Sequence, residues 1–113
     1  MAGNKKNIAR LAGFLKKNPN DSFTKFALAL ELLKSNEVSK ARILFESVLK
    51  QDPEYVGVYY HLGKLYERTG RLQEAAEMYE TGLKVAEKQN NTRTVIELKD
   101  ALELIKPDLK HDT

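Results

Sequence analysis

Cysteine and tryptophan are absent from this 113-residue sequence, and proline occurs only three times. Without cysteine the chain forms neither a disulfide nor a thiolate metal site. No apolar run approaches the roughly 20 residues that a membrane-spanning helix requires. Charged residues interrupt the basic N-terminal stretch, so it lacks the continuous apolar core of a secretory signal. These absences predict an intracellular, cytoplasmic protein without a membrane span.

The residues that are present predict one folded, all-helical domain. Hydrophobic residues make up 42% of the chain and charged residues 31%, which is typical of a globular protein. Apolar residues recur at helical spacing throughout, and no segment alternates with period two. Proline, glycine and asparagine divide the chain into six expected helices, at residues 4–17, 22–34, 38–50, 53–68, 72–88 and 92–105.

An internal repeat becomes visible when the chain is shifted against itself by 34 residues. Pro19 then falls on Pro53. The same shift of 34 relates the pairs Leu28 and Leu62, Ala29 and Gly63, Ala41 and Ala75, and Phe45 and Tyr79. A fixed period of this length indicates repeated helix–turn–helix units.

The period and its motifs resemble those of the tetratricopeptide repeat family. The motif of the second repeat is Tyr59-x2-Leu62-Gly63-x2-Tyr66 followed by Ala75-x3-Tyr79. The first repeat matches more loosely, with Lys25-x2-Leu28-Ala29-x2-Leu32 followed by Ala41-x3-Phe45. It departs from the family pattern at Lys25, where an aromatic residue is usual, and at Ala29, where glycine is usual.

The resemblance implies an all-α fold in which 34-residue units stack as a short right-handed α-solenoid of about six helices. The expected divisions are an N-terminal helix resembling half a repeat (1–21), repeat one (22–55), repeat two (56–89), a closing helix (90–106) and a polar, frayed tail (107–113). Within repeat two, Gly63 is expected to face Ala75 and Tyr79, where a missing Cβ permits close packing of the two helices.

Residues suited to catalysis are scarce. The two histidines, His61 and His111, have no cysteine or second nearby histidine with which to form a metal or nucleophilic site. The sequence therefore predicts a protein that is not an enzyme, with no cofactor, no metal and no small-molecule substrate.

A binding surface is expected on the first helix of each repeat, because in the resembled family these helices line a concave groove for a peptide or a partner helix. The candidate groove residues are Phe23, Phe26, Leu30, Tyr60, His61, Lys64 and Arg68. The closing helix would add Arg93, Ile96, Glu97 and Asp100. Apolar side chains at such a surface indicate a partner site, and a cationic strip would receive an acidic segment. The alternatives are that the basic N-terminal helix or a side chain of the adjacent unit covers the apolar side chains, and that the charges are merely solvated.

The predicted function is a scaffold or adaptor that binds a protein or peptide partner. The family members that clamp the acidic tails of heat-shock chaperones use lysine and asparagine at places that here hold Phe26, Leu30 and His61, so such a clamp is not expected. One alternative is a nucleic-acid or anionic-lipid surface on the basic N-terminal helix, carried by Lys5, Lys6, Arg10, Lys16 and Lys17. Another is self-association, for example a homodimer, through the end helices.

Overall fold

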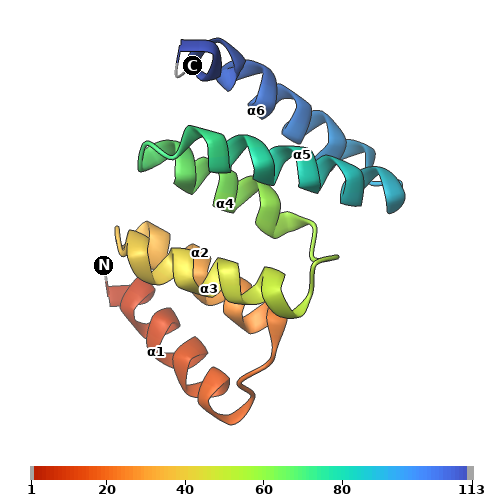
Figure 1. Ribbon diagram of the computed structural model, residues 1–113. Coiled ribbons are helices and arrows are strands. Elements are labelled where there is room, and N and C mark those ends of the chain that lie inside the picture. Colours follow the sequence, from red (N-terminus) through yellow and green to blue (C-terminus); the bar gives the residue numbers. More distant parts are fainter. Residues whose placement is uncertain (1, 112–113) are drawn as a thin grey trace. The chain divides into compact units, whose positions relative to one another are not determined.

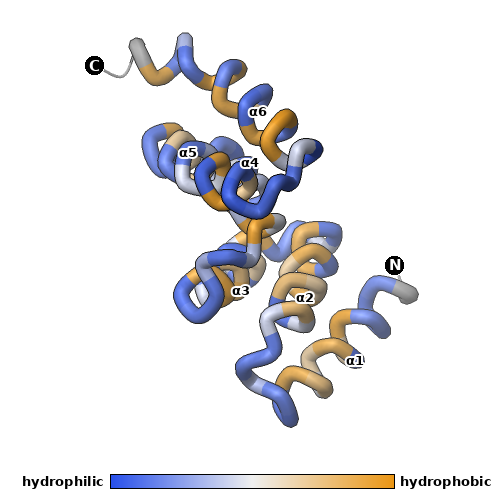
Figure 2. Tube along the Cα trace, turned by 90° about the vertical axis from the view of Figure 1, so that its right-hand side faces the viewer, coloured by the Kyte–Doolittle hydropathy of each residue, from blue (hydrophilic) through white to orange (hydrophobic). Residues whose placement is uncertain are grey.

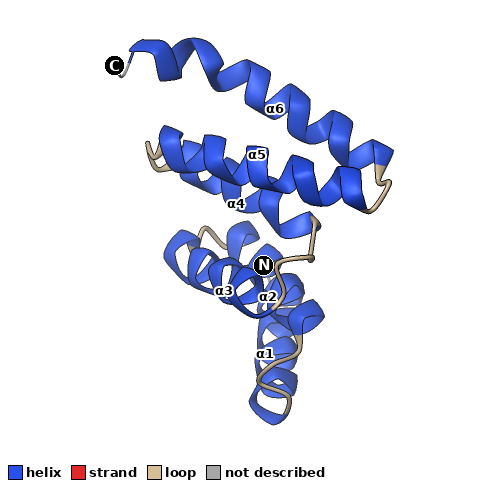
Figure 3. Cartoon of the chain, turned by 45° about the vertical axis from the view of Figure 1, so that its right-hand side comes forward, coloured by secondary structure: helices blue, strands red, loops and turns tan. Residues whose placement is uncertain are grey.

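The computed structural model describes residues 2–111. Over this range the chain folds into six α-helices and no strand (Figures 1 and 3). The helices are α1 (Ala2–Lys17), α2 (Ser22–Lys34), α3 (Val38–Gln51), α4 (Gly57–Arg68), α5 (Leu72–Lys88) and α6 (Thr92–His111). The all-α prediction is confirmed, and most helix boundaries lie within two residues of the expected ones.

Two predicted boundaries were wrong. Pro53 does not begin α4: residues 53–56 form a turn in which the Tyr55 backbone N–H donates to the Asp52 carbonyl at 3.0 Å, and α4 begins at Gly57. Pro107 does not end α6, which continues to His111. The continuation places Leu109 in a half-buried position, which favours helix beyond the proline. Residues 112–113, the end of the predicted tail, lie outside the described residues.

Three helices end with a residue in the left-handed backbone conformation. Asn36, Gly70 and Asn90 follow α2, α4 and α5 with φ values of 60°, 78° and 57°. After each of them the next backbone N–H reaches back into the helix, as in the 2.8 Å bond from Arg71 N to the Tyr66 carbonyl. This arrangement is the Schellman motif, which glycine and asparagine favour. The breaks expected at these residues are therefore built from the residue types that the motif requires.

The chain divides into two compact units, Met1–Tyr55 and Val56–Thr113. In the first unit α2 packs against both α1 and α3. It is accordingly the most continuously apolar helix in Figure 2. The core residues of this first unit are Leu28, Ala29, Leu32, Ala41, Phe45 and Val48. At the start of α2, the side chain of Asp21 caps the helix by accepting a 2.9 Å hydrogen bond from the backbone N–H of Thr24. It also accepts a hydrogen bond from the Thr24 hydroxyl, and the hydroxyl and then the backbone N–H lower the pKa of Asp21.

Lys25 is buried inside the first unit, at the position where the family pattern has an aromatic residue. Its Nζ donates hydrogen bonds to Ser47 Oγ at 2.9 Å and Gln51 Oε1 at 2.7 Å. Gln51 Nε2 in turn donates to Ser22 Oγ at 2.7 Å. A buried ammonium group is costly unless hydrogen bonds satisfy it, and this network between α2 and α3 provides them.

In the second unit α5 packs against α4 and α6, and α4 and α6 also touch each other. The largest side chains that are almost completely buried here are Tyr79, Leu62, Leu65, Leu98 and Val58. Two glycines allow close packing. A Cβ added to Gly63 would lie 2.8 Å from Cδ1 and Cζ of Tyr79, and one added to Gly82 would lie 2.9 Å from Tyr59 Cγ and 3.1 Å from Leu98 Cδ1. The expectation that Gly63 permits contact with Tyr79 is confirmed; Gly82 was not foreseen.

Candidate functional site

The predicted site residues of α4 share one side of that helix. This side lies between the buried side of α4, which faces α5, and the solvent-exposed side. Its residues, here called the α4 stripe, are Tyr60, His61, Lys64 and Arg68. Tyr60, His61 and Lys64 are half-buried, whereas Arg68 is exposed. The core residue Leu62 is 1% exposed and anchors the helix, so the α4 stripe is held on a rigid element.

Three members of the α4 stripe touch one another. The rings of Tyr60 and His61 meet edge to face with centroids 5.6 Å apart. Lys64 Nζ lies 5.7 Å from the centroid of the Tyr60 ring and 3.8 Å from Glu67 Oε2. The first distance is within range of a cation–π interaction. The lysine is therefore already engaged by an aromatic face and a carboxylate.

His61 does not contribute positive charge to the α4 stripe near neutral pH. Burial lowers the pKa of His61 below its ordinary value of 6.5, and the nearby Glu97 carboxylate opposes that shift only in part. The imidazole is consequently neutral at pH 7. Of the residues expected to make this face cationic, only Lys64 and the exposed Arg68 carry a positive charge.

A pocket of about 170 Å³ opens beside the α4 stripe, between α4 and α6. Its lining residues are Tyr60, Lys64, Glu97, Asp100, Ala101 and Leu104. This set is called the α4–α6 pocket below. Lys64 thus shares its pocket with two carboxylates, and the site is of mixed charge instead of cationic.

The α6 side of the α4–α6 pocket was only partly foreseen. Glu97 and Asp100 were expected to face the site, and they do line the pocket. Ala101 and Leu104 were missed, although they continue the same helical face at spacings of three and four residues. Beyond residue 88 the sequence no longer follows the 34-residue period, so the repeat does not give equivalent positions on α6. This slip in the repeat register concealed the continuation.

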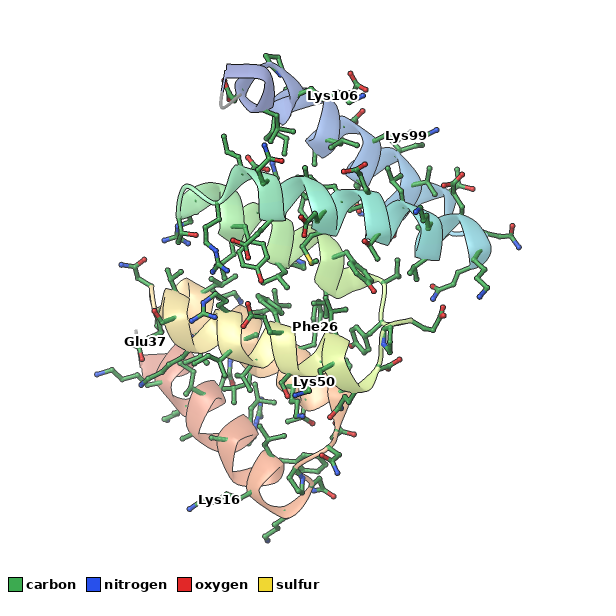
Figure 4. All side chains as sticks on the ribbon, viewed as in Figure 1. Lys16, Phe26, Glu37, Lys50, Lys99 and Lys106 are labelled. Atoms are coloured by element: carbon green, nitrogen blue, oxygen red, sulfur yellow. The ribbon has the colours of Figure 1, made fainter. Side chains whose placement is uncertain are left out.

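The remaining predicted residues belong to α2, in the other unit. Phe23 is 68% exposed, whereas Phe26 and Leu30 are half-buried. Phe26, labelled in Figure 4, packs its ring 5.9 Å from that of Phe45 and 5.3 Å from that of Tyr55. Phe26 is therefore partly covered by two rings of its own unit, whereas Phe23 remains exposed. The seven predicted residues form two sets, one on each unit.

The basic residues of α1 lie on its outer side. Lys5, Lys6, Arg10, Lys16 and Lys17 are all exposed, and Lys16 points outward in Figure 4. Among the described residues, none form a cluster of three or more His, Asp or Glu side chains suited to a metal ion. Nor does any helix in the described part of the chain have the length and apolar character needed to cross a membrane.

Comparison with known protein families gives a match. The description of the matching family is "Tetratricopeptide repeat", and the match covers residues 26–91. A comparison with curated proteins found no match.

Solved structures agree with the family match. The crystal structure of a tetratricopeptide repeat domain protein from Salinibacter ruber is 45% identical, with a TM-score of 0.75; the similarity covers 77% of this chain and 97% of that one. A protein from Bordetella parapertussis is 23% identical with a TM-score of 0.78, covering 93% of each chain. The TPR2B domain of yeast Sti1, solved in its complex with pHsp70, is 16% identical with a TM-score of 0.83, covering 90% of this chain and 82% of that one. These likenesses confirm the predicted fold class of helical repeats.

Proposed function

Because the chain belongs to the tetratricopeptide repeat family, we propose that it is a non-catalytic interaction module that binds a peptide or helix of another protein. The observation that carries this proposal is the α4–α6 pocket, an open site whose walls come from two helices. Both helices are held by buried residues, Leu62 on α4 and Leu98 on α6. A surface that is already ordered loses little conformational entropy on binding, so a few contacts suffice for useful affinity.

The exposed face of α2 provides a second contact surface in this proposal. Phe23 places a mostly exposed aromatic ring at the start of the helix, and Leu30 lies two turns further along on the same side. Aromatic side chains are enriched among the residues that dominate binding energy at protein interfaces. The surface therefore favours a partner segment with apolar anchors.

The yeast Sti1 domain, which has this fold, was solved in a complex with pHsp70. The residues of this chain do not favour a clamp on an acidic chaperone tail. The resemblance places Phe26, Leu30 and His61 where lysine and asparagine residues hold the terminal carboxylate of such tails. In addition, Glu97 and Asp100 would repel an acidic segment at the α4–α6 pocket.

Affinity capture with paired variants tests the proposal. The chain is immobilised and exposed to a cytoplasmic extract, and the captured proteins are compared for wild type, Asp100→Lys and Phe23→Ala. Lys99→Glu and Phe14→Ala serve as controls, since Lys99 projects outward from α6 (Figure 4) and Phe14 is an exposed residue of α1. We expect the first two variants to lose partners that both controls retain, with unchanged circular dichroism. Equal capture by all four variants would refute the assignment of these surfaces.

A further inference from the structure

The size of the α4–α6 pocket limits what it can hold. Small-molecule sites usually measure about 300–1,000 Å³. At about 170 Å³ this pocket is smaller than that range, yet it has room for several water molecules at roughly 30 Å³ each. A pocket of this volume suits one long side chain of a partner, and not a metabolite or cofactor.

The walls of the pocket combine an aromatic ring with an exposed apolar rim. Tyr60 forms part of the α4 wall, and Leu104 on α6 is 73% exposed. Ile96, which is 55% exposed, lies eight residues before Leu104, with Asp100 midway between them. Residues spaced four apart follow one face of a helix, so two large apolar side chains flank the acidic position.

The charges of the pocket favour a cationic occupant. Two carboxylates, Glu97 and Asp100, face one ammonium group, that of Lys64. Lys64 is already engaged with Glu67 and the Tyr60 ring, and Glu97 has a long contact of 3.9 Å with Arg93. Within the described part of the chain Asp100 forms no ion pair. The carboxylates of the pocket therefore carry negative charge that a cationic group of a partner would neutralise.

We propose that the α4–α6 pocket binds one arginine side chain of a protein partner, whose adjacent apolar residues rest on Ile96 and Leu104. Arginine fits better than lysine, because its planar guanidinium stacks on an aromatic face and donates to two carboxylates at once. The inference rests on the proposed interaction function and specifies the partner segment that this pocket selects: an arginine flanked by apolar residues.

A selection from displayed random peptides tests this specificity without knowledge of the natural partner. The full chain is used as bait in three forms: wild type, the double variant Glu97→Gln with Asp100→Asn, and the double variant Glu77→Gln with Glu80→Gln. The last removes the same charge from exposed positions of α5 outside the pocket. The chain carries a net charge of +3, so non-specific attraction would enrich acidic peptides and not basic ones.

We expect wild type and the α5 double variant to enrich peptides with an arginine beside apolar residues, and the pocket double variant to lose that preference. Peptides enriched without arginine, or with acidic residues, would overturn the inference but leave the interaction function standing. If no peptide is enriched above the display scaffold, the proposed function fails as well.

The selected consensus peptide then provides a quantitative test. Replacing its arginine by citrulline, which keeps the shape and removes the charge, is expected to weaken binding to wild type about tenfold. For the pocket double variant the same replacement is expected to change affinity by less than about twofold. Fluorescence anisotropy measures all four combinations. Equal losses for both baits would place the arginine outside this pocket and overturn the inference.

Discussion

In each repeat a small residue on the first helix is paired with a large aromatic residue on the second. Where the small residue is larger by one methyl group, the aromatic residue is smaller by one hydroxyl group. Tyr79 packs on Gly63, and 34 residues earlier Phe45 takes the place of the tyrosine while Ala29 takes that of the glycine. Tyr79 donates a hydrogen bond to Glu67, whose counterpart in the first repeat is an apolar residue, Leu33. Phenylalanine needs no such acceptor, so each ring has the partner that its chemistry requires.

The Gly63 contact predicts that a single methyl group destabilises the second unit. Gly63→Ala gains up to about 1 kcal/mol of helix propensity, but overpacking against the buried Tyr79 ring costs about 1–3 kcal/mol. Gly13→Ala is the matched control, because an added Cβ there meets nothing within 4 Å. Urea unfolding should show a less stable Gly63→Ala and a more stable Gly13→Ala. A Gly63→Ala chain at least as stable as wild type would contradict the packing argument.

The buried Tyr79 predicts a specific loss of stability at alkaline pH. Burial and the hydrogen bond to Glu67 raise the pKa of Tyr79 above its ordinary value of 10.0. The folded state therefore keeps this proton after the unfolded chain has released it. The resulting stability is complete below about pH 10 and falls above it by about 1.4 kcal/mol per pH unit.

Tyr79→Phe isolates this contribution. The variant lacks the ionisable hydroxyl, while Tyr55, whose pKa is also raised, is present in both proteins and its effect cancels. Urea unfolding between about pH 9 and about pH 11, on either side of the ordinary tyrosine pKa, should give a shallower decline for the variant than for wild type. Parallel declines would show that Tyr79 does not titrate differently in the folded state.

At the scale of helices, the sequence predicted correctly those helix ends that depend on the type of a single residue. Asn36 and Gly70 mark helix ends because their types tolerate the left-handed conformation found there. Pro53 and Pro107 misled, because a proline permits several local structures and tertiary packing decides among them. The prediction of the α6 side of the α4–α6 pocket was incomplete for a related reason. Residues such as Leu104 come from a helix that no longer follows the 34-residue period.

The closing helix α6 provides a contrast between buried and exposed leucines. Leu98 is fully buried in the second unit, whereas Leu104 is 73% exposed at the rim of the pocket. Leu98→Ala should lower the free energy of unfolding by about 2–5 kcal/mol, and Leu104→Ala by less than about 0.5 kcal/mol. Chemical denaturation of the two variants measures both values. A large loss for Leu104→Ala would mean that this side chain supports the fold and is not free to contact a partner.

At the scale of the whole molecule, most contacts within each unit join helices adjacent in sequence: α1 with α2, α2 with α3, α4 with α5, and α5 with α6. The smaller contact between α4 and α6 lies within the second unit. In arrays of this kind stability is approximately a sum of repeat terms and nearest-neighbour terms. Damage to the core of one unit should therefore be felt most strongly inside that unit. The same locality lets a binding surface vary without disturbing distant helices.

Hydrogen exchange can test this locality with one core change in each unit. Phe45→Leu in the first unit and Ile105→Val in the second each remove part of a side chain that is almost fully buried. A loss of about 1.4 kcal/mol corresponds to tenfold faster exchange through opening. We expect Phe45→Leu to accelerate exchange in α2 and α3 by about that factor and to leave α5 much less affected, with the reverse for Ile105→Val. Uniform acceleration over α2–α5 in both variants would instead show that the chain opens as one cooperative body, and a partner bound to α4 and α6 would then stabilise every helix equally.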